Sequence, residues 1–398
     1  MDILFSFQDN LLKQVTNNFY RSLYDRINWQ QRMLAIKGLR GAGKTTLILQ
    51  YIKYKLGNAR NEALYVTADH HWFYTHTLLE VADEHYKNGG RHLFIDEVHK
   101  YPGWSNELKL IYDGYPDLKV AFTSSSALDI YRGEADLSRR VISYELTGLS
   151  FREFLELSGT ASIETFSFQA IRKDHVKIAK HITNQFQPLP VFKNYLTYGY
   201  LPIYTENSAT EISQKLEQII NTTVESDLSY IQQYTAATAH KVKRLLGILA
   251  ESVPFKPNIS ALAKKLDVSR DSIYAWLVHL QKARLLNLLS PQGKGTSLLQ
   301  KPEKIYLENT NLSFALKSIP DVGSIRETFL LNQLLNNGLD VHFPKSGDFF
   351  TNDTFIEVGG KTKTAKQVDQ YDQFIVAADQ IEIGYKDKVP LWLFGMLY

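Results

Sequence analysis

A glycine-rich octapeptide constrains this chain more than any other feature. It reads Gly38-Leu39-Arg40-Gly41-Ala42-Gly43-Lys44-Thr45 and lies between two apolar runs, Met33–Ile36 and Thr45–Ile52. When a strand leads into such a loop and a helix follows it, the backbone N–H groups of the loop point toward a bound phosphate. A glycine-rich turn without a ligand is the alternative, and the flanking runs argue against it. We therefore predict a P-loop that binds ATP through Gly38, Arg40, Gly41, Ala42, Gly43, Lys44, Thr45 and Thr46.

Two adjacent carboxylates follow another apolar run. His92–Ile95 leads directly into Asp96 and Glu97. In P-loop enzymes the loop hydroxyl, here Thr45, and a strand-end aspartate hold magnesium, while the loop lysine, here Lys44, reaches the β- and γ-phosphates. Glu97 is suited to polarise the attacking water. The pair favours hydrolysis over kinase chemistry, so we predict a magnesium-dependent ATPase; a solvated strand end is the alternative.

A cluster of hydroxyl groups follows the next apolar run. Val120–Phe122 is followed by Thr123-Ser124-Ser125-Ser126. The carboxyl ends of parallel strands meet at one edge of a sheet, where ligands bind. A hydroxyl at this position, for which we take Ser125, is therefore expected to touch the γ-phosphate or to position water. A plain serine-rich turn explains the cluster equally well.

Short apolar runs alternate with helical stretches over the first 160 residues. Strands that are separated by helices predict βαβ units and a parallel sheet, and hence an α/β fold. Within the first thirty residues, apolar positions at helical spacing predict a helix ahead of the first strand. The expected strands are Met33–Ile36, Ala63–Val66, His92–Ile95, Val120–Phe122 and Val141–Leu146.

The composition is that of a globular protein, with 44% hydrophobic and 22% charged residues. The chain has no cysteine, which excludes disulfides, thiolate catalysis and cysteine-based metal sites. Its net charge of +3 is too small to indicate a partner. The first residues lack a basic segment followed by an apolar run, and no apolar stretch has the length needed to span a bilayer. We expect a cytoplasmic protein without membrane contact.

Together these motifs resemble a family of prokaryotic AAA-type ATPases with a C-terminal domain of unknown function, over nearly the whole chain. The chain departs from that family at Ser124 and Tyr200, where the family usually has glycine. The resemblance implies that Arg140 is the arginine finger, which acts in cis or from another subunit of an oligomer. The matching blocks are Phe94–Lys100 with Trp104, Thr123–Ser126, Leu137–Arg140, Leu149–Phe154 and Tyr198–Pro202.

Residues 240–305 differ from the rest of the chain in charge. They hold twelve basic and four acidic residues, an excess of eight positive charges, so the remainder of this +3 chain carries −5. Pro257–Leu266 and Arg270–Gln281 are typical of two helices joined by a turn. Leu285–Leu289 and Lys304–Leu307 fit the two strands of a wing. We predict a winged helix.

The basic module has two candidate partners. On DNA, we expect phosphate contacts from Lys264 and Lys265 and further contacts from Arg270, Ser272, Tyr274 and Lys294. Winged helices also serve as lids and protein-docking modules in AAA-type ATPases, so a protein partner is the alternative. The positive charge favours nucleic acid.

The last segment resembles a restriction-endonuclease-like core. Such nucleases gather magnesium with an early Glu, an Asp and the Glu of a Glu-x-Lys element, whose lysine assists the attacking water. Glu327, Asp348 and Glu357 take the acidic positions, but Gly359 stands at the lysine position. Lys361 is an alternative source of the ammonium. Loss of catalysis, with the fold kept as a binding platform, explains the pattern more simply.

These readings give four domains and three hypotheses for the function. The leading hypothesis is an ATPase that couples nucleotide state to a DNA-binding winged helix. The others are a nucleotide-dependent regulatory or interaction protein with slow hydrolysis, and an ATP-gated magnesium-dependent nuclease. The apolar runs Ile381–Gly384 and Val389–Gly395 are expected to be strands of the last domain. The predicted domains are a P-loop domain (1–159), a helical lid or linker (160–235), the winged helix (236–306) and the nuclease-like domain (307–398).

Overall fold

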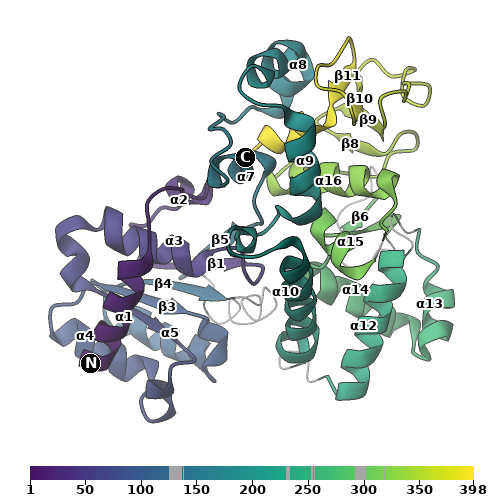
Figure 1. The fold of residues 1–398 in the computed structure, drawn as a ribbon. Coiled ribbons are helices and arrows are strands. Elements are labelled where there is room, and N and C mark those ends of the chain that lie inside the picture. Colours follow the sequence, from purple (N-terminus) through teal and green to yellow (C-terminus); the bar gives the residue numbers. More distant parts are fainter. Residues whose placement is uncertain are drawn as a thin grey trace. The chain divides into compact units, whose positions relative to one another are not determined.

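The computed structural model describes residues 1–124, 137, 139–229, 234–251, 254, 256–291, 302–317 and 319–398. The chain divides into two compact units, Met1–Thr147 and Gly148–Tyr398. Figure 1 shows their elements in colours that run from purple at the N-terminus to yellow at the C-terminus. The finer division at residues 159, 235 and 306 stays a prediction.

A five-stranded parallel sheet is the centre of the first unit. The strand order is β2-β3-β4-β1-β5, and every neighbouring pair runs parallel. β1, which precedes the glycine-rich loop, is buried along its whole length, as expected for a strand covered on both faces. The predicted α/β fold is therefore confirmed. The strands are β1 (Met33–Gly38), β2 (Ala63–Thr67), β3 (His92–Asp96), β4 (Lys119–Ser124) and β5 (Ile142–Leu146).

The helices of the first unit contribute apolar faces to the core of the sheet. Leu4 of α1, Val81 of α4 and Leu108 of α5 are fully buried in one cluster with side chains of β1 to β4. Burying a leucine-sized side chain stabilises the fold by roughly 1.5–3 kcal/mol. The helical segments are α1 (Asp2–Gln14), α2 (Leu23–Arg26), α3 (Lys44–Gln50) with its π-helical continuation η1 (Tyr51–Lys55), η2 (Gly57–Glu62), η3 (His71–Tyr74), α4 (Leu78–Lys87), η4 (Val98–Lys100) and α5 (Trp104–Gly114).

Helices also open the second unit, as the sequence predicts. Ser150 and Glu153 form a capping box at the start of α7, and Ser208 and Glu211 form another at the start of α10. Such boxes satisfy backbone N–H groups that a helix leaves unpaired. The segments are α7 (Phe151–Leu157), α8 (Phe168–Thr183), α9 (Pro188–Tyr198), η5 (Pro202–Glu206), α10 (Ala209–Thr222), η6 (Thr223–Leu228) and α12 (Ala236–Glu251).

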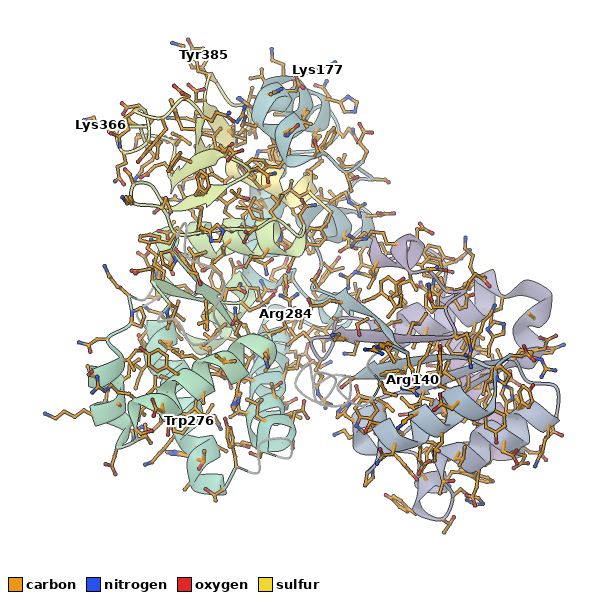
Figure 2. The ribbon with its side chains drawn as sticks, turned by 180° about the vertical axis from the view of Figure 1, so that it is seen from behind. Arg140, Lys177, Trp276, Arg284, Lys366 and Tyr385 are labelled. Atoms are coloured by element: carbon orange, nitrogen blue, oxygen red, sulfur yellow. The ribbon has the colours of Figure 1, made fainter. Side chains whose placement is uncertain are left out.

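A helix–turn–helix with two antiparallel strands follows. α13 (Ile259–Leu266) is followed by its C-cap Asp267, whose φ is 52°. α14 (Arg270–Lys282) begins after Ser269, whose hydroxyl caps it, and buries Trp276 (Figure 2). β6 (Leu286–Leu289) pairs with β7 (Lys304–Leu307) within one residue of the strands expected from sequence.

A mixed sheet ends the chain, in the order β11-β10-β9-β8. Of the two runs expected as strands, Ile381–Gly384 forms none, and only Val389 and Pro390 of Val389–Gly395 lie in a strand, β11. At Ile381–Gly384 the chain enters a tight turn, where Tyr385 and Lys388 exchange backbone hydrogen bonds. After Pro390 it coils into a buried 3-10 helix, η7. The elements are α15 (Thr310–Leu316), α16 (Val322–Asn336), β8 (Phe349–Thr351), β9 (Thr354–Gly359), β10 (Phe374–Ala378), β11 (Lys388–Pro390) and η7 (Leu391–Met396).

Among the residues that the structure describes, no helix combines the length and the apolar character needed to cross a membrane.

Candidate active site

The glycine-rich loop connects β1 to α3, as the sequence predicts. Gly38 ends β1 in register with Leu146 of β5. A Cβ atom on Gly38 would lie 2.1 Å from the Leu146 carbonyl oxygen, so no other residue fits between the two strands. Gly43 has a φ of 96° at the N-cap of α3, a left-handed conformation that favours glycine. The loop therefore delivers Lys44 and Thr45 to the first turn of the helix.

Lys44 is folded back over the loop. Its side chain is buried, and Nζ donates hydrogen bonds to the carbonyl oxygens of Gly38 at 3.0 Å and Leu39 at 3.1 Å. A buried ammonium needs such acceptors, since removing it from water is costly. Both acceptors belong to the loop, so the charge is held where a phosphate would enter.

Asp96, at the end of β3, is the hub of the site. The Thr45 hydroxyl donates to its Oδ2 at 2.5 Å, and the Tyr65 hydroxyl donates to the same oxygen at 2.8 Å. On the other oxygen, Oδ1 accepts from the Thr123 hydroxyl and from the Glu97 backbone N–H at 3.2 Å. Burial and the neighbouring Asp96 raise the pKa of Tyr65 far above its usual value, so its hydroxyl stays a donor. The oxygens of Thr45 and Asp96 are hard ligands of the kind that magnesium prefers.

Glu97 reaches the loop from a strained backbone. Its φ is 51°, in the left-handed region that costs a non-glycine residue about 1 kcal/mol. The conformation is fixed where its N–H donates to Thr123 Oγ1 at 3.0 Å. Its carboxylate Oε2 lies 3.7 Å from Arg40 Nη2 and 3.7 Å from His99 Nε2. The predicted base therefore lies beside a residue of the P-loop.

Three residues of the site were missed from sequence. Thr123 binds Asp96, whereas the predicted Ser125 lies outside the described residues. His99 is buried and contacts Ser124 Oγ at 3.0 Å. Arg21 braces the loop by donating to the carbonyl oxygens of Ala42 at 2.6 Å and Thr147 at 2.8 Å. The hydroxyl cluster was a usable signal for Thr123; nothing in the local sequence indicates Arg21.

Arg140 is paired with α5. Its Nε and Nη2 donate to the two carboxylate oxygens of Asp113 at 3.1 Å and 3.0 Å (Figure 2 labels Arg140). This hydrogen-bonded pair holds the pKa of Asp113 below its usual value. The structure thus places the predicted finger on an exposed carboxylate of its own unit.

The predicted DNA-contacting residues differ in their exposure to solvent. Lys264, Lys265 and Arg270 are exposed. Ser272 is half-buried, and its hydroxyl lies 2.9 Å from that of the N-cap Ser269. The other two are Tyr274, which is half-buried on α14, and Lys294, which lies outside the described residues.

The three acids of the nuclease-like segment are brought together around lysines. Lys304 Nζ lies 3.3 Å from Glu327 Oε2 and 3.7 Å from Asp348 Oδ1. Lys363 pairs with the buried Glu357. Burial raises the pKa of Glu327 and that of Glu357 above the usual range. The ammonium beside Glu357 therefore comes from Lys363, not from the exposed Lys361. Across the described residues, no group of three or more His, Cys, Asp or Glu side chains is arranged to hold a metal ion.

Two segments match known domain families. Residues 30–155 match a model described as an AAA domain, and residues 189–322 match a domain of unknown function (DUF8612). The chain is also 27% identical over 393 residues to the uncharacterized protein MJ1637 of Methanocaldococcus jannaschii, covering 91% of this chain and 82% of that protein.

Solved structures give weaker likenesses. The Walker-type ATPase PABY2304 of Pyrococcus abyssi has a TM-score of 0.44 and 11% identity, covering 75% of this chain and 95% of that one. DnaA from Aquifex aeolicus bound to AMPPCP has a TM-score of 0.25 and 14% identity, covering 69% and 86%. At these low TM-scores neither carries an argument about activity. The family match and the geometry of the loop support an AAA-type P-loop ATPase domain in residues 30–155, with nucleotide binding and hydrolysis as its activity.

Proposed function

We propose that this chain is a magnesium-dependent ATPase that couples its nucleotide state to a winged helix, and that this winged helix binds DNA. The observation that carries the ATPase proposal is the contact between Thr45 and Asp96, made beside Glu97 at the mouth of the P-loop. It brings the expected cation ligands, the loop and the expected base into one place.

The residues divide the work in the proposed reaction. Lys44 exchanges the carbonyl oxygens of Gly38 and Leu39 for phosphate oxygens, and the N–H groups of the loop bind the β-phosphate. Thr45 and Asp96 hold magnesium, which when bound neutralises the charge that develops on the phosphates. Glu97 orients and deprotonates the attacking water, a role worth roughly 10²–10⁴-fold in rate.

Two variants test the ATPase proposal. Lys44→Ala is expected to abolish binding of a fluorescent ATP analogue. Glu97→Gln is expected to retain that binding while phosphate release falls by at least about a hundredfold. Lys55→Ala, an exposed lysine at the end of the same helical segment, is the matched control and leaves both unchanged. Unchanged affinity in Lys44→Ala, or normal turnover in Glu97→Gln, contradicts the proposal.

The DNA proposal rests on charge and exposure. The excess of eight positive charges in residues 240–305 includes the exposed Lys264, Lys265 and Arg270 near the turn between α13 and α14. Lysines that contact phosphates release counterions, so binding weakens with salt by about one unit of slope per contact. A regulatory protein that docks a protein partner through the same module is the alternative.

DNA binding is measured by fluorescence anisotropy at several salt concentrations. The double variant Lys264→Glu/Lys265→Glu is expected to lower affinity and reduce the salt slope by about two. The matched control makes the same charge change at Lys177 and Lys180 of α8, both exposed (Figure 2 labels Lys177). Phosphate release that rises with DNA supports coupling. No salt-dependent binding, together with indifference of the ATPase to DNA, favours the protein-partner alternative.

We propose that the nuclease-like segment is a platform without cleavage activity. The support is the position of Lys304, whose ammonium pairs with Glu327 and Asp348 where a nuclease would bind a cation. Plasmid nicking in the presence of magnesium, with and without ATP, tests this: we expect none. Nicking by the unmodified protein that disappears in Glu357→Ala would establish the ATP-gated nuclease instead.

A further inference from the structure

We infer that His99 is a positioning residue for Glu97 and that it connects this base to the end of strand β4 through Ser124. The inference rests on the proposed function, since the orientation of Glu97 matters to turnover only if Glu97 handles the attacking water. Three side chains carry it, Ser124, His99 and Glu97, in that order.

Donors and acceptors can be assigned to the contacts that His99 makes with Ser124 and Glu97. Burial, followed by the cations Lys100, Arg40 and Lys44, lowers the pKa of His99 to about 3, so the imidazole is neutral and carries one N–H. The Glu97 carboxylate only accepts hydrogen bonds, which favours the proton on Nε2, the nitrogen that faces it. Nδ1 is then an acceptor, and the Ser124 hydroxyl, 3.0 Å away, is its donor. The Ser124 hydroxyl, which can donate as well as accept, accommodates the tautomer that suits Glu97.

His99 and Glu97 lie close to each other but do not share a hydrogen bond in this structure. At 3.7 Å, His99 Nε2 is beyond hydrogen-bonding distance of Oε2, and Arg40 Nη2 lies at the same 3.7 Å from that oxygen. Arg40 belongs to the nucleotide-binding loop, where an incoming phosphate competes for its guanidinium. Once Arg40 turns to phosphate, the N–H of His99 remains to orient the carboxylate.

The end of β4 contacts the Asp96 carboxylate and the His99 imidazole. Thr123 donates to Asp96 directly, and the next residue, Ser124, contacts His99. Successive side chains of a strand point to opposite faces, so neighbouring residues reach the two acids by separate routes. A movement of this strand end therefore changes the cation ligand and the base together.

Two amide substitutions separate the contacts of His99. The Asn amide occupies the place of Nδ1 and keeps only the contact with Ser124, whereas the Gln amide occupies the place of Nε2 and keeps only the contact with Glu97. We expect His99→Asn to lower kcat by about tenfold with KM for ATP unchanged, and His99→Gln to stay within about threefold of the unmodified protein. Ser124→Ala should lower kcat by about threefold, and should have no further effect in His99→Asn.

The outcomes separate this inference from the proposed function. Normal turnover in Glu97→Gln overturns both. If Glu97→Gln is inactive while His99→Asn keeps its full kcat, the proposed role of His99 is contradicted and the proposed function stands. Equal losses in the Asn and Gln variants, a raised KM, or additive effects of His99→Asn and Ser124→Ala also overturn it, because each indicates a structural role. In the residual activity of Glu97→Gln, His99→Asn should change nothing.

Discussion

The Thr45 hydroxyl donates a hydrogen bond to Asp96 Oδ2 at 2.5 Å, so the two residues expected to share a magnesium ion contact each other directly. A hydroxyl that donates in one direction keeps its lone pairs for another. The contact therefore leaves the oxygen of Thr45 able to accept a cation while Asp96 holds its orientation. Tyr65 and Thr123 hold Asp96 in turn.

Substitutions at Thr45 test this arrangement. Thr45→Val keeps the shape but removes the hydroxyl, and we expect turnover to fall by at least about a hundredfold because the cation loses a ligand. Thr45→Ser keeps the hydroxyl and should retain turnover within about fivefold. The measurement is phosphate release against magnesium concentration. Equal activity of the Val and Ser variants would contradict the role of Thr45 as a magnesium ligand.

Gly38→Ala tests the close contact between β1 and β5. The added methyl would lie 2.1 Å from the Leu146 carbonyl oxygen, so one strand must move. We expect a loss of about 3 kcal/mol in the free energy of unfolding and weaker ATP binding. Gly247→Ala in α12 is the control, because nothing lies within 4 Å of its added methyl. It should stabilise by up to about 1 kcal/mol. Equal stability of the two variants contradicts the model of the strand contact.

The pair between Arg140 and Asp113 predicts a gain of turnover. If Arg140 acts as a finger, its bond to Asp113 competes with that role. Asp113→Asn keeps the shape and weakens the pair, so we expect turnover to rise about two- to fivefold, as suits an exposed ion pair. The rise should vanish in Arg140→Lys. A rise that persists there would show that Asp113 acts independently of Arg140.

The parts of the fold that local sequence encodes were predictable. Apolar runs such as His92–Ile95 mark the strands of the parallel sheet, and the glycine-rich octapeptide marks the loop between β1 and α3. Contacts between distant residues were not predictable in this way. Arg21 reaches the carbonyl of Thr147 across 126 positions of sequence, and His99 is identified only by what surrounds it.

The C-terminal segment shows the same limit. The sequence correctly marks Gly359 as unable to supply an ammonium, but loop geometry places Lys363 beside Glu357. Ile381–Gly384 is apolar like a strand, yet the turn at Tyr385 removes it from the sheet. In both places the structure depends on the path of a loop, and that path depends on how the strands on either side of it pair.

Lys304→Met tests the pairing of Lys304 with Glu327 and Asp348. Removing the ammonium leaves Glu327 and Asp348 facing each other, and we expect a loss of about 2 kcal/mol in the free energy of unfolding. Glu327 has a pKa raised above its usual 4.5, and losing Lys304 raises it further. Stability from such a group is full below pH 4.5 and is lost as pH rises through the folded pKa, so the loss should be larger at pH 7.5 than at pH 5. A loss that is independent of pH contradicts this account.

His99 should make the first unit sensitive to acid. Its pKa falls from 6.5 to about 3 on folding, so its contribution to stability is present above pH 6.5 and is lost as pH falls toward 3. Between pH 7.5 and pH 5 this one group should cost about 2 kcal/mol of the free energy of unfolding. Other buried histidines titrate too, so the measurement is the difference between the unmodified protein and His99→Gln in urea unfolding at both values of pH. Because glutamine does not titrate, the difference should shrink at pH 5; a constant difference would mean that His99 is protonated in the folded state.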